Sequence, residues 1–306
     1  MDATLADLGE DALIERLTAG LPRGDGLVCG GKDDCAVLRD PGNERRYRLL
    51  KTDAAVEGVH FSADTDPERA GRKALCRPLS DFAAMGGGEA RAALVTFAAP
   101  AEYSAARAEG FYEGIRRAAE TFGVTVAGGE TVSLPKGNAA SLTIMLEGSI
   151  PREHCVFRSG ARLGDAILVT GGLGGSLESG WHLDFQPRLA EARWLVESVG
   201  WRPTAMMDLS DGLAKDLPRL ARASGGLGYR IDFDAVPRRA GRDLAHALGD
   251  GEDYELLFTL PTAFLGELET EWAAAFPGTP LTLIGQITES IETPLEGGWE
   301  HFRSRP

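Results

Sequence analysis

The sequence predicts a mixed α/β (α+β) protein that is built from two domains. Three observations support this fold class. The chain has 306 residues, apolar strand-like runs alternate with amphipathic segments in both halves, and the acidic phrase LSD occurs once in each half, at 79–81 and 209–211. A chain of this length more often forms two domains than one. We place the boundary near SIPREHC at 149–155, and therefore predict domains at 1–150 and 151–306.

The first half is expected to contain alternating helices and strands. Helical apolar spacing predicts helices over 5–19 and 102–122, and a third helix that begins at Asp66-Pro67 and ends near Gly86. Pro78 lies inside that third helix and should kink or split it. Apolar runs predict strands over 47–56, 91–100, 124–131 and 140–150, whereas the glycine-rich acidic stretch 23–38 is expected to be a loop.

The second half repeats this mixture of elements. It opens with a strand near 165–170, a glycine-rich turn and a helix, and a further helix is expected around 187–199. The run MMDLSDGL then predicts a strand and turn at 204–212, followed by a helix to about 223. Strands are expected at 228–233, 252–260 and 281–288, with a helix over 262–275.

Composition narrows the class of partner. The formal net charge is −14, which disfavours nucleic acid and anionic membrane surfaces but allows a nucleotide that binds through divalent cations. Its four cysteines form no C-x-x-C pair, and the acidic amphipathic N-terminus is unlike a signal peptide. With no run of about 18 apolar residues, the sequence predicts a cytoplasmic protein with reduced thiols.

Two glycine-rich stretches have an ordinary and a functional interpretation. GLVCGGKD at 26–33 nearly fits a P-loop, but Asp33 stands where Ser or Thr would bind magnesium, so a true P-loop is disfavoured. GGLGGS at 171–176 follows a strand but lacks the third glycine of a dinucleotide-binding fingerprint. It is expected to be a tight turn whose backbone N–H groups are able to face an anion.

The acidic residues at turns carry more information. Any one carboxylate at such a position is commonly a cap or turn former. As a set they lie beside glycine-rich turns after apolar strands, where loops carry chemistry. Oxygen ligands suit magnesium, which usually pairs a few carboxylates with substrate phosphates. The set comprises Asp33, Asp34, Asp53, Asp81, Glu130, Asp208 and Asp211.

The order of short motifs along the chain resembles the thiamine-monophosphate kinases of the aminoimidazole-ribonucleotide-synthetase-like superfamily. The motifs are DDCAVL, KTDAAVEGVHF, KALCRPLSDFAAMGG, FYEGI, GGET, RSGARLGD, VTGGLGGS, MDLSDGL, GEDYELLF and GWEHF. The resemblance implies an N-terminal sheet domain that pairs across a homodimer, a C-terminal α/β domain, and ATP in the cleft where they meet.

The resemblance also implies roles for particular residues. Metal ligands would be Asp34, Thr52, Asp53, Asp81, Glu130, Asp208 and Asp211. ATP contacts would be Tyr112, Gly129, Glu130, Arg158 and Ser210. Thiamine monophosphate would be held by His60, Glu252 and Trp299. Taken alone, His60 suits a packed core histidine and Trp299 suits a core aromatic.

The implied reaction moves the γ-phosphoryl group of ATP onto thiamine monophosphate with several magnesium ions. A phosphate monoester has its second pKa near ~6, so the acceptor is already ionised at neutral pH and needs neither a general base nor a covalent nucleophile. Catalysis would then come from positioning the two substrates and from neutralising their phosphate charges. The flat cationic thiazolium suits an aromatic face and an acid.

Four positions depart from the family pattern near the metals: Lys32, Lys51, Pro78 and Glu130. Side chains alternate along a strand, so Lys51 shares a face with Asp53, about 6.5 Å away. The Lys51 ammonium is expected either to reach the metal pocket or to bend into solvent.

Three other functions stay open at this point. One is another enzyme of the superfamily with a different phosphorylated product. The second is a diverged member that binds nucleotide or thiamine phosphate with altered or no catalysis. A metal-dependent phosphatase is the third, although such enzymes usually use histidine ligands and the chain has five histidines.

Overall fold

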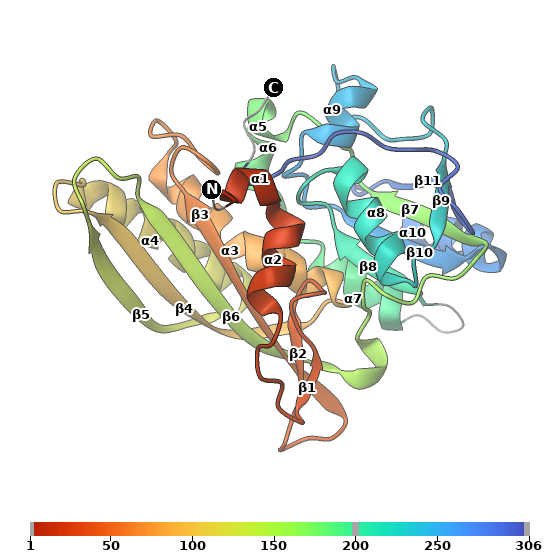
Figure 1. Cartoon of the computed structure of the whole chain (residues 1–306), viewed down its shortest axis with the longest axis horizontal. Coiled ribbons are helices and arrows are strands. Elements are labelled where there is room, and N and C mark those ends of the chain that lie inside the picture. The colour runs from red at the N-terminus through yellow and green to blue at the C-terminus, as the bar shows by residue number, and fades with distance from the viewer. Residues whose placement is uncertain (1–2, 198–201, 303–306) are drawn as a thin grey trace.

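The computed structural model describes residues 3–197 and 202–302 and contains two β-sheets with helices packed against them (Figure 1). All strands of the first sheet come from residues 27–151, and all strands of the second come from residues 165–288. This confirms the predicted mixed α/β class.

The first sheet has six strands in the order β1-β2-β3-β6-β4-β5. Its strands are β1 (Leu27–Cys29), β2 (Ala36–Arg39), β3 (Arg46–Val56), β4 (Glu89–Pro100), β5 (Thr125–Leu134) and β6 (Ser141–Pro151). Its ladders are antiparallel except for the parallel pair β4–β5. The stretch 23–38, expected to be a loop, therefore contributes β1 and part of β2.

Two long helices, α3 (Pro67–Ala84) and α4 (Ala105–Phe122), cover one face of this sheet. The Asp66 side chain caps α3 by accepting from the N–H of Glu68 at 2.9 Å, and Gly123 ends α4 in the left-handed conformation. Alternate residues of β6, Leu142, Ile144 and Leu146, are fully buried under the helices. The sheet thus has one packed face and one open face.

Pro78 does not split α3, which is a single helix from Pro67 to Ala84. The proline removes one backbone hydrogen bond. Most of the helix from Ala70 onward is buried, and this packing outweighs the local cost.

The second sheet has five antiparallel strands in the order β8-β10-β7-β11-β9. These are β7 (Asp165–Thr170), β8 (Ala205–Asp208), β9 (Gly228–Ile231), β10 (Leu256–Pro261) and β11 (Leu281–Thr288). The main helices are α7 (Leu189–Glu197), α8 (Leu213–Ala223), α9 (Leu244–Gly249) and α10 (Leu265–Ala275). Short turns of helix are η1 (Arg152–His154), α5 (Ser176–Ser179), α6 (Trp181–Asp184) and η2 (Thr262–Phe264).

This sheet is covered on both faces, which explains why every residue of β7 and β8 is buried. Leu217 of α8 belongs to the core on one face with Ile167 and Val169. Trp272 of α10 belongs to the core on the other face with Leu168 and Met206. A strand buried on both faces reads as a continuous apolar run, as AILVT and AMM do here.

The N-terminal segment forms α1 (Leu5–Leu8) and α2 (Glu10–Thr18), separated at Gly9, whose φ is +72°. A single helix over 5–19 was expected, and the left-handed glycine breaks it. In Figure 1 α2, drawn in red, lies in front of the junction between the two sheets. Glu10 pairs with Lys215 of α8 at 2.7 Å, which ties this segment to the second half of the chain.

Within residues 3–197 and 202–302, no helix combines the length and apolar character needed to cross a bilayer.

Candidate functional site

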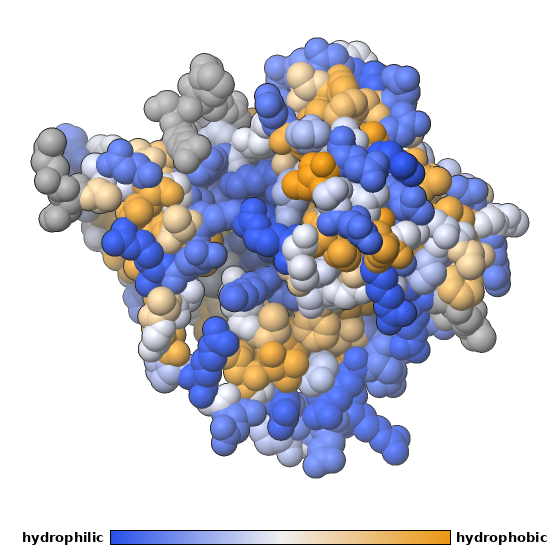
Figure 2. Space-filling view, turned by 45° about the vertical axis from the view of Figure 1, so that its right-hand side comes forward, coloured by the Kyte–Doolittle hydropathy of each residue, from blue (hydrophilic) through white to orange (hydrophobic). Residues whose placement is uncertain are grey.

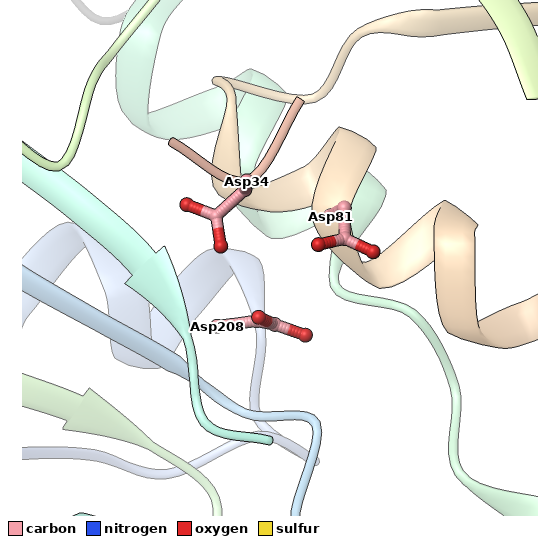
Figure 3. A group of neighbouring side chains, drawn as sticks. All are labelled: Asp34, Asp81 and Asp208. Carbon is pink, nitrogen blue, oxygen red and sulfur yellow. The ribbon is translucent and has the colours of Figure 1, made fainter. Parts of the chain in front are cut away.

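Three buried carboxylates from distant parts of the chain point toward one another (Figure 3). Asp34 lies in the turn before β2, Asp81 lies on α3, and Asp208 ends β8. One oxygen from each lies within 4.8 Å of the others. The first LSD phrase contributes Asp81, and Asp208 directly precedes the second phrase, so α3 and β8 bring the two halves of the chain to a single site.

This donor set fits a hard divalent cation such as magnesium, because it offers only carboxylate oxygens at a buried position. Burial, followed by the nearby Asp34 charge, raises the pKa of Asp208 to about 7. Burial, together with Asp53, Asp208 and Asp34, also raises the pKa of Asp81. Protons and a divalent ion would therefore compete for Asp81 and Asp208.

Each carboxylate of the group already has a partner within the chain. The Arg158 guanidinium binds Asp34 in a two-bond fork, with Nη2 at 2.6 Å and Nε at 3.0 Å. Lys51 Nζ lies 2.6 Å from Asp81 Oδ1. The Ser80 hydroxyl donates to Asp208 at 2.6 Å. The site thus contains fixed positive charge next to the carboxylate oxygens.

Asp53 lies on β3 beside this group. It pairs across the sheet with the buried Ile144 and therefore faces α3, where Arg77 Nη2 lies 3.9 Å from its Oδ1. Burial alone would raise the pKa of Asp53, but Lys51 and Arg77 outweigh it and hold the pKa below its usual range. Thr52, the intervening residue, is exposed on the open face of the sheet.

Asp211 and Ser210 follow β8 but turn toward α8. Asp211 Oδ2 pairs with Arg219 at 2.6 Å and with Lys215 at 3.1 Å. The backbone N–H groups of Ser210 and Asp211 both donate to Asp216, at 3.0 and 2.9 Å. Asp211 is therefore held by two cations of α8, apart from the three-carboxylate group.

The predicted substrate residues meet around one lysine that the sequence analysis did not single out. Lys73 of α3 is fully buried, and its Nζ contacts the Glu252 carboxylate, the His60 carbonyl oxygen at 2.6 Å and His182 Nδ1 at 2.7 Å. Burial lowers the pKa of Lys73 to about 8, against the opposing effect of Glu252. Lys73 therefore connects His60 with Glu252, which come from opposite halves of the chain.

Arg77 joins the two ends of the site, since it contacts Asp53 and also Glu252 at 3.0 Å. Lys73, Arg77 and Asp81 are spaced four residues apart, which places them on one face of α3. That spacing in KALCRPLSD is the signal that could have identified the two cations from sequence.

His60 and Trp299 approach each other through His301. The His301 ring lies 6.0 Å from His60 and 5.9 Å from Trp299, measured between ring centroids. His60 Nδ1 accepts from the Val56 N–H at 3.0 Å, and burial, with the Arg77 charge, lowers the pKa of His60 to about 3. His60 is therefore neutral at physiological pH.

A cavity of about 560 Å³ opens beside these residues, lined by His60 and Phe61 on one side and by Glu178, His182 and Leu183 on the other. The space-filling view shows a hydrophilic hollow near the middle of the face that it presents (Figure 2). A cavity of this size with charged and aromatic walls suits a small polar ligand.

Tyr112, Gly129 and Glu130 form a separate group. They line a cavity of about 450 Å³ along β5, the exposed edge strand at the left of Figure 1. Glu130 pairs with Thr96, which lies opposite Thr143, which lies opposite Ala54 of β3. Three strand spacings, about 14 Å, therefore separate Glu130 from β3. One chain does not bring this group to the carboxylates.

Comparisons with known proteins agree with this arrangement. A family model described as AIR synthase related protein, N-terminal domain, matches residues 32–149. The thiamine-monophosphate kinase of Salmonella typhimurium is 36% identical over 286 residues, covering 85% of this chain and 84% of that protein. The thiamine-monophosphate kinase of Rhodopirellula baltica is 35% identical over 293 residues, covering 90% and 87%. A solved structure of AaThiL complexed with AMPPCP and TMP has a TM-score of 0.81 at 29% identity, covering 98% of this chain and 99% of that chain.

The buried acids predict how the metal-free protein responds to pH. Folding raises the pKa of Asp33 and Asp208 from 3.8 to about 7 and that of Asp216 to about 8, in each case first through burial. Between about pH 4 and about pH 8 the folded state therefore binds more protons at these three groups than the unfolded state, so their contribution to the free energy of unfolding should fall as the pH rises through this range. Thermal unfolding in excess chelator measures this effect. Asp208→Asn should flatten the dependence, and a melting temperature that rises over this range would contradict it.

Proposed function

The chain belongs to the thiamine-monophosphate kinase family, and on that premise we propose that it transfers the γ-phosphoryl group of ATP to thiamine monophosphate, producing thiamine diphosphate. The observation that carries this proposal is the match over 98% of the chain to AaThiL, a structure that contains AMPPCP and TMP. Relatives with about the same length and at least 35% identity are thiamine-monophosphate kinases.

We propose that Asp34, Asp81 and Asp208, with Asp53 beside them, hold magnesium. When bound, the magnesium ions neutralise phosphate charge and orient the polyphosphate. Arg158, already fixed by two bonds to Asp34, is placed to contact a phosphate oxygen that enters between them. The acceptor phosphate is ionised at neutral pH, so transfer is direct and in line, without a phosphoenzyme or a general base.

The substrate end of the site is proposed to consist of His60, Glu252 and Trp299. Glu252 is held by Lys73, by Arg77 and by the Tyr254 hydroxyl at 2.9 Å, which fixes its carboxylate. Its backbone φ is +59°, and its N–H donates to the Ser210 carbonyl at 2.7 Å. A fixed acid and an indole face suit the cationic thiazolium ring. The phosphate of this ligand would then point along α3 toward Asp81.

A homodimer is proposed to complete the ATP site. Tyr112, Gly129, Glu130 and Thr52 lie on exposed surface of the first sheet or of the helix that covers it. The open face of that sheet also exposes Leu94 and Val132. A second copy packed on this face would bury these apolar residues and bring its own β5 group to the carboxylates. Residues 1–150 would then be the dimerising, metal- and ATP-binding domain, and residues 151–306 would complete the site.

The cell compartment is proposed to be the cytoplasm, because the four cysteines are free thiols. The acidic balance of the chain supports small-molecule substrates and argues against nucleic acid or membrane partners.

A second candidate function is a binding protein with altered or no catalysis, and the Lys51–Asp81 contact at 2.6 Å is the observation that favours it. The lysine occupies a carboxylate that a kinase would use for magnesium. A magnesium-dependent product assay separates the two functions.

The purified protein with ATP, magnesium and thiamine monophosphate should form thiamine diphosphate, measured by chromatography. Asp81→Asn should lower the rate at least about 100-fold, because it removes a charge from the centre of the site. Asp25→Asn makes the same change at an exposed position and should leave the rate unchanged. Absence of product at every magnesium concentration would favour the binding protein, and a labelled phosphoprotein formed from ATP alone would overturn direct transfer.

Trp299→Ala should raise KM for thiamine monophosphate about 2- to 30-fold while changing KM for ATP little, in line with a cation–π contact of about 0.5–2 kcal/mol. The Trp299 N–H and carbonyl bind Asp211 and Lys215, and these backbone contacts survive the substitution. Trp299→Phe keeps an aromatic face and should recover most of the affinity. Equal changes in both KM values would show that Trp299 has only a structural role.

The mass in solution should be about twice 32.6 kDa, measured by light scattering after size exclusion. Val132→Asp places a charge on the open face and should shift the protein to monomer with loss of activity. Leu163→Asp is the matched control, because Leu163 is also an exposed apolar residue but lies outside the first sheet. A fully active monomer would refute the dimer.

A further inference from the structure

We infer that Lys51 takes the place of one divalent cation, so that the Asp53–Asp81 side of the site carries a fixed ammonium and metal binds on the Asp34–Asp208 side. This inference rests on the proposed function for its purpose. Its geometry and its main test concern cation binding alone.

The backbone of β3 directs Lys51 into the site. Lys51 pairs across the sheet with Leu146 and Asp53 pairs with Ile144, and both partners are fully buried. Lys51 and Asp53 therefore share the face that packs on α3, as the alternation of the strand requires. Of the two orientations expected from sequence, the side chain adopts the one that enters the pocket.

The Lys51 ammonium forms an ion pair with Asp81 in this pocket. Lys51 Nζ lies 2.6 Å from Asp81 Oδ1, and 22% of the Lys51 side chain is exposed compared with 8% for Asp81. A primary ammonium is charged at neutral pH, and a carboxylate at this distance keeps it so. The Lys51 side chain is therefore partly open to solvent.

A second fixed cation strengthens this side of the site. Arg77 Nη2 lies 3.9 Å from Asp53 Oδ1. Lys51 and Arg77 thus face Asp53 and Asp81, whereas the contact that the structure gives Asp208 is the neutral Ser80 hydroxyl. The protein therefore supplies two cations to the Asp53–Asp81 side and one, Arg158 on Asp34, to the other side, where Asp208 is left to a metal ion.

The charge balance agrees with this division. Asp34, Asp53, Asp81 and Asp208 carry four negative charges when ionised, and Lys51, Arg77 and Arg158 supply three positive charges. One divalent ion therefore reverses the sign of the pocket before nucleotide enters. A further ion on the Asp53 side would meet the ammonium at short range.

An ammonium and a magnesium ion are not equivalent. Both neutralise phosphate charge, but Lys51 offers three donors on a flexible stem and imposes no octahedral coordination. Lys51 is thus expected to donate hydrogen bonds to a phosphate oxygen while Asp81 fixes its position. The enzyme then depends on fewer metal ions than a site with a hydroxyl side chain at this position.

The direct test is the number of manganese ions bound per chain with AMPPCP, counted by electron paramagnetic resonance. Lys51→Ser should bind one more ion than the unmodified protein, and its rate should depend more steeply on magnesium with a higher half-maximal concentration. Lys51→Arg keeps the charge and should keep the original count. Lys136→Ser removes a lysine from the loop between β5 and β6 and should change neither quantity. An unchanged count in Lys51→Ser would overturn the inference.

A second measurement uses the unmodified protein and does not depend on the folding of a variant. The chain has five lysines, so the ¹⁵Nζ signals of labelled lysine are few, and Lys51→Arg identifies one of them. The Lys51 ammonium signal should persist when magnesium and AMPPCP saturate the site. Its loss on saturation would mean that metal displaces the lysine, which would overturn the inference. Both readouts stand even if no thiamine diphosphate is formed, so failure of the proposed function is recognised separately.

Discussion

The repulsion among carboxylates that are buried together is the constraint on which the rest of this structure depends. Asp34, Asp81 and Asp208 place their oxygens within 4.8 Å of one another at positions with little solvent. Two like charges about 4 Å apart repel by roughly 4 kcal/mol at an effective dielectric constant near 20. The fork from Arg158, the Lys51 ammonium and the Ser80 hydroxyl oppose this repulsion and allow the chain to fold around the group.

Helix α3 connects the carboxylate group with the Lys73 end of the site. It contacts α6, α7 and β8 as well as its own sheet, so it packs against both halves of the molecule. Lys73 and Asp81 are eight residues apart on it, about 12 Å along the axis at the usual helical rise. Lys73 holds the side chains proposed to bind thiamine, Asp81 holds the metal end, and Arg77 between them contacts both Glu252 and Asp53. With the proposed site assignment, one rigid element would fix the spacing between the acceptor and donor phosphates.

Three of the departures from the family pattern differ in what they do to the site. Lys51 adds a charge to the pocket itself. Pro78 is accommodated inside a buried helix without interrupting it, so the face carrying Arg77 and Asp81 is preserved. Glu130 lies on the open face of the first sheet, where its side chain is exposed to solvent. Of these three changes only Lys51 alters the charge within the pocket, and the fold that assembles the site stays the same, as the match to AaThiL shows.

Local sequence patterns predicted most of the elements and their order, and the motifs identified the family. Apolar periodicity is a local property, and it predicted the helix that contains the first LSD phrase, the strand before and the helix after the second, and the shared face of Lys51 and Asp53. It predicted a kink or split at Pro78 and a continuous helix over 5–19. Helix α3 is not split, because its burial outweighs the local cost of the proline, and the left-handed Gly9 interrupts the helix over 5–19. Only the tertiary structure decided that Asp81 and Asp208 meet while Asp211 turns to Arg219, and that Lys73 joins His60 to Glu252. These side-chain contacts depend on how the two sheets pack across α3, which is a long-range arrangement that no local pattern of residues encodes.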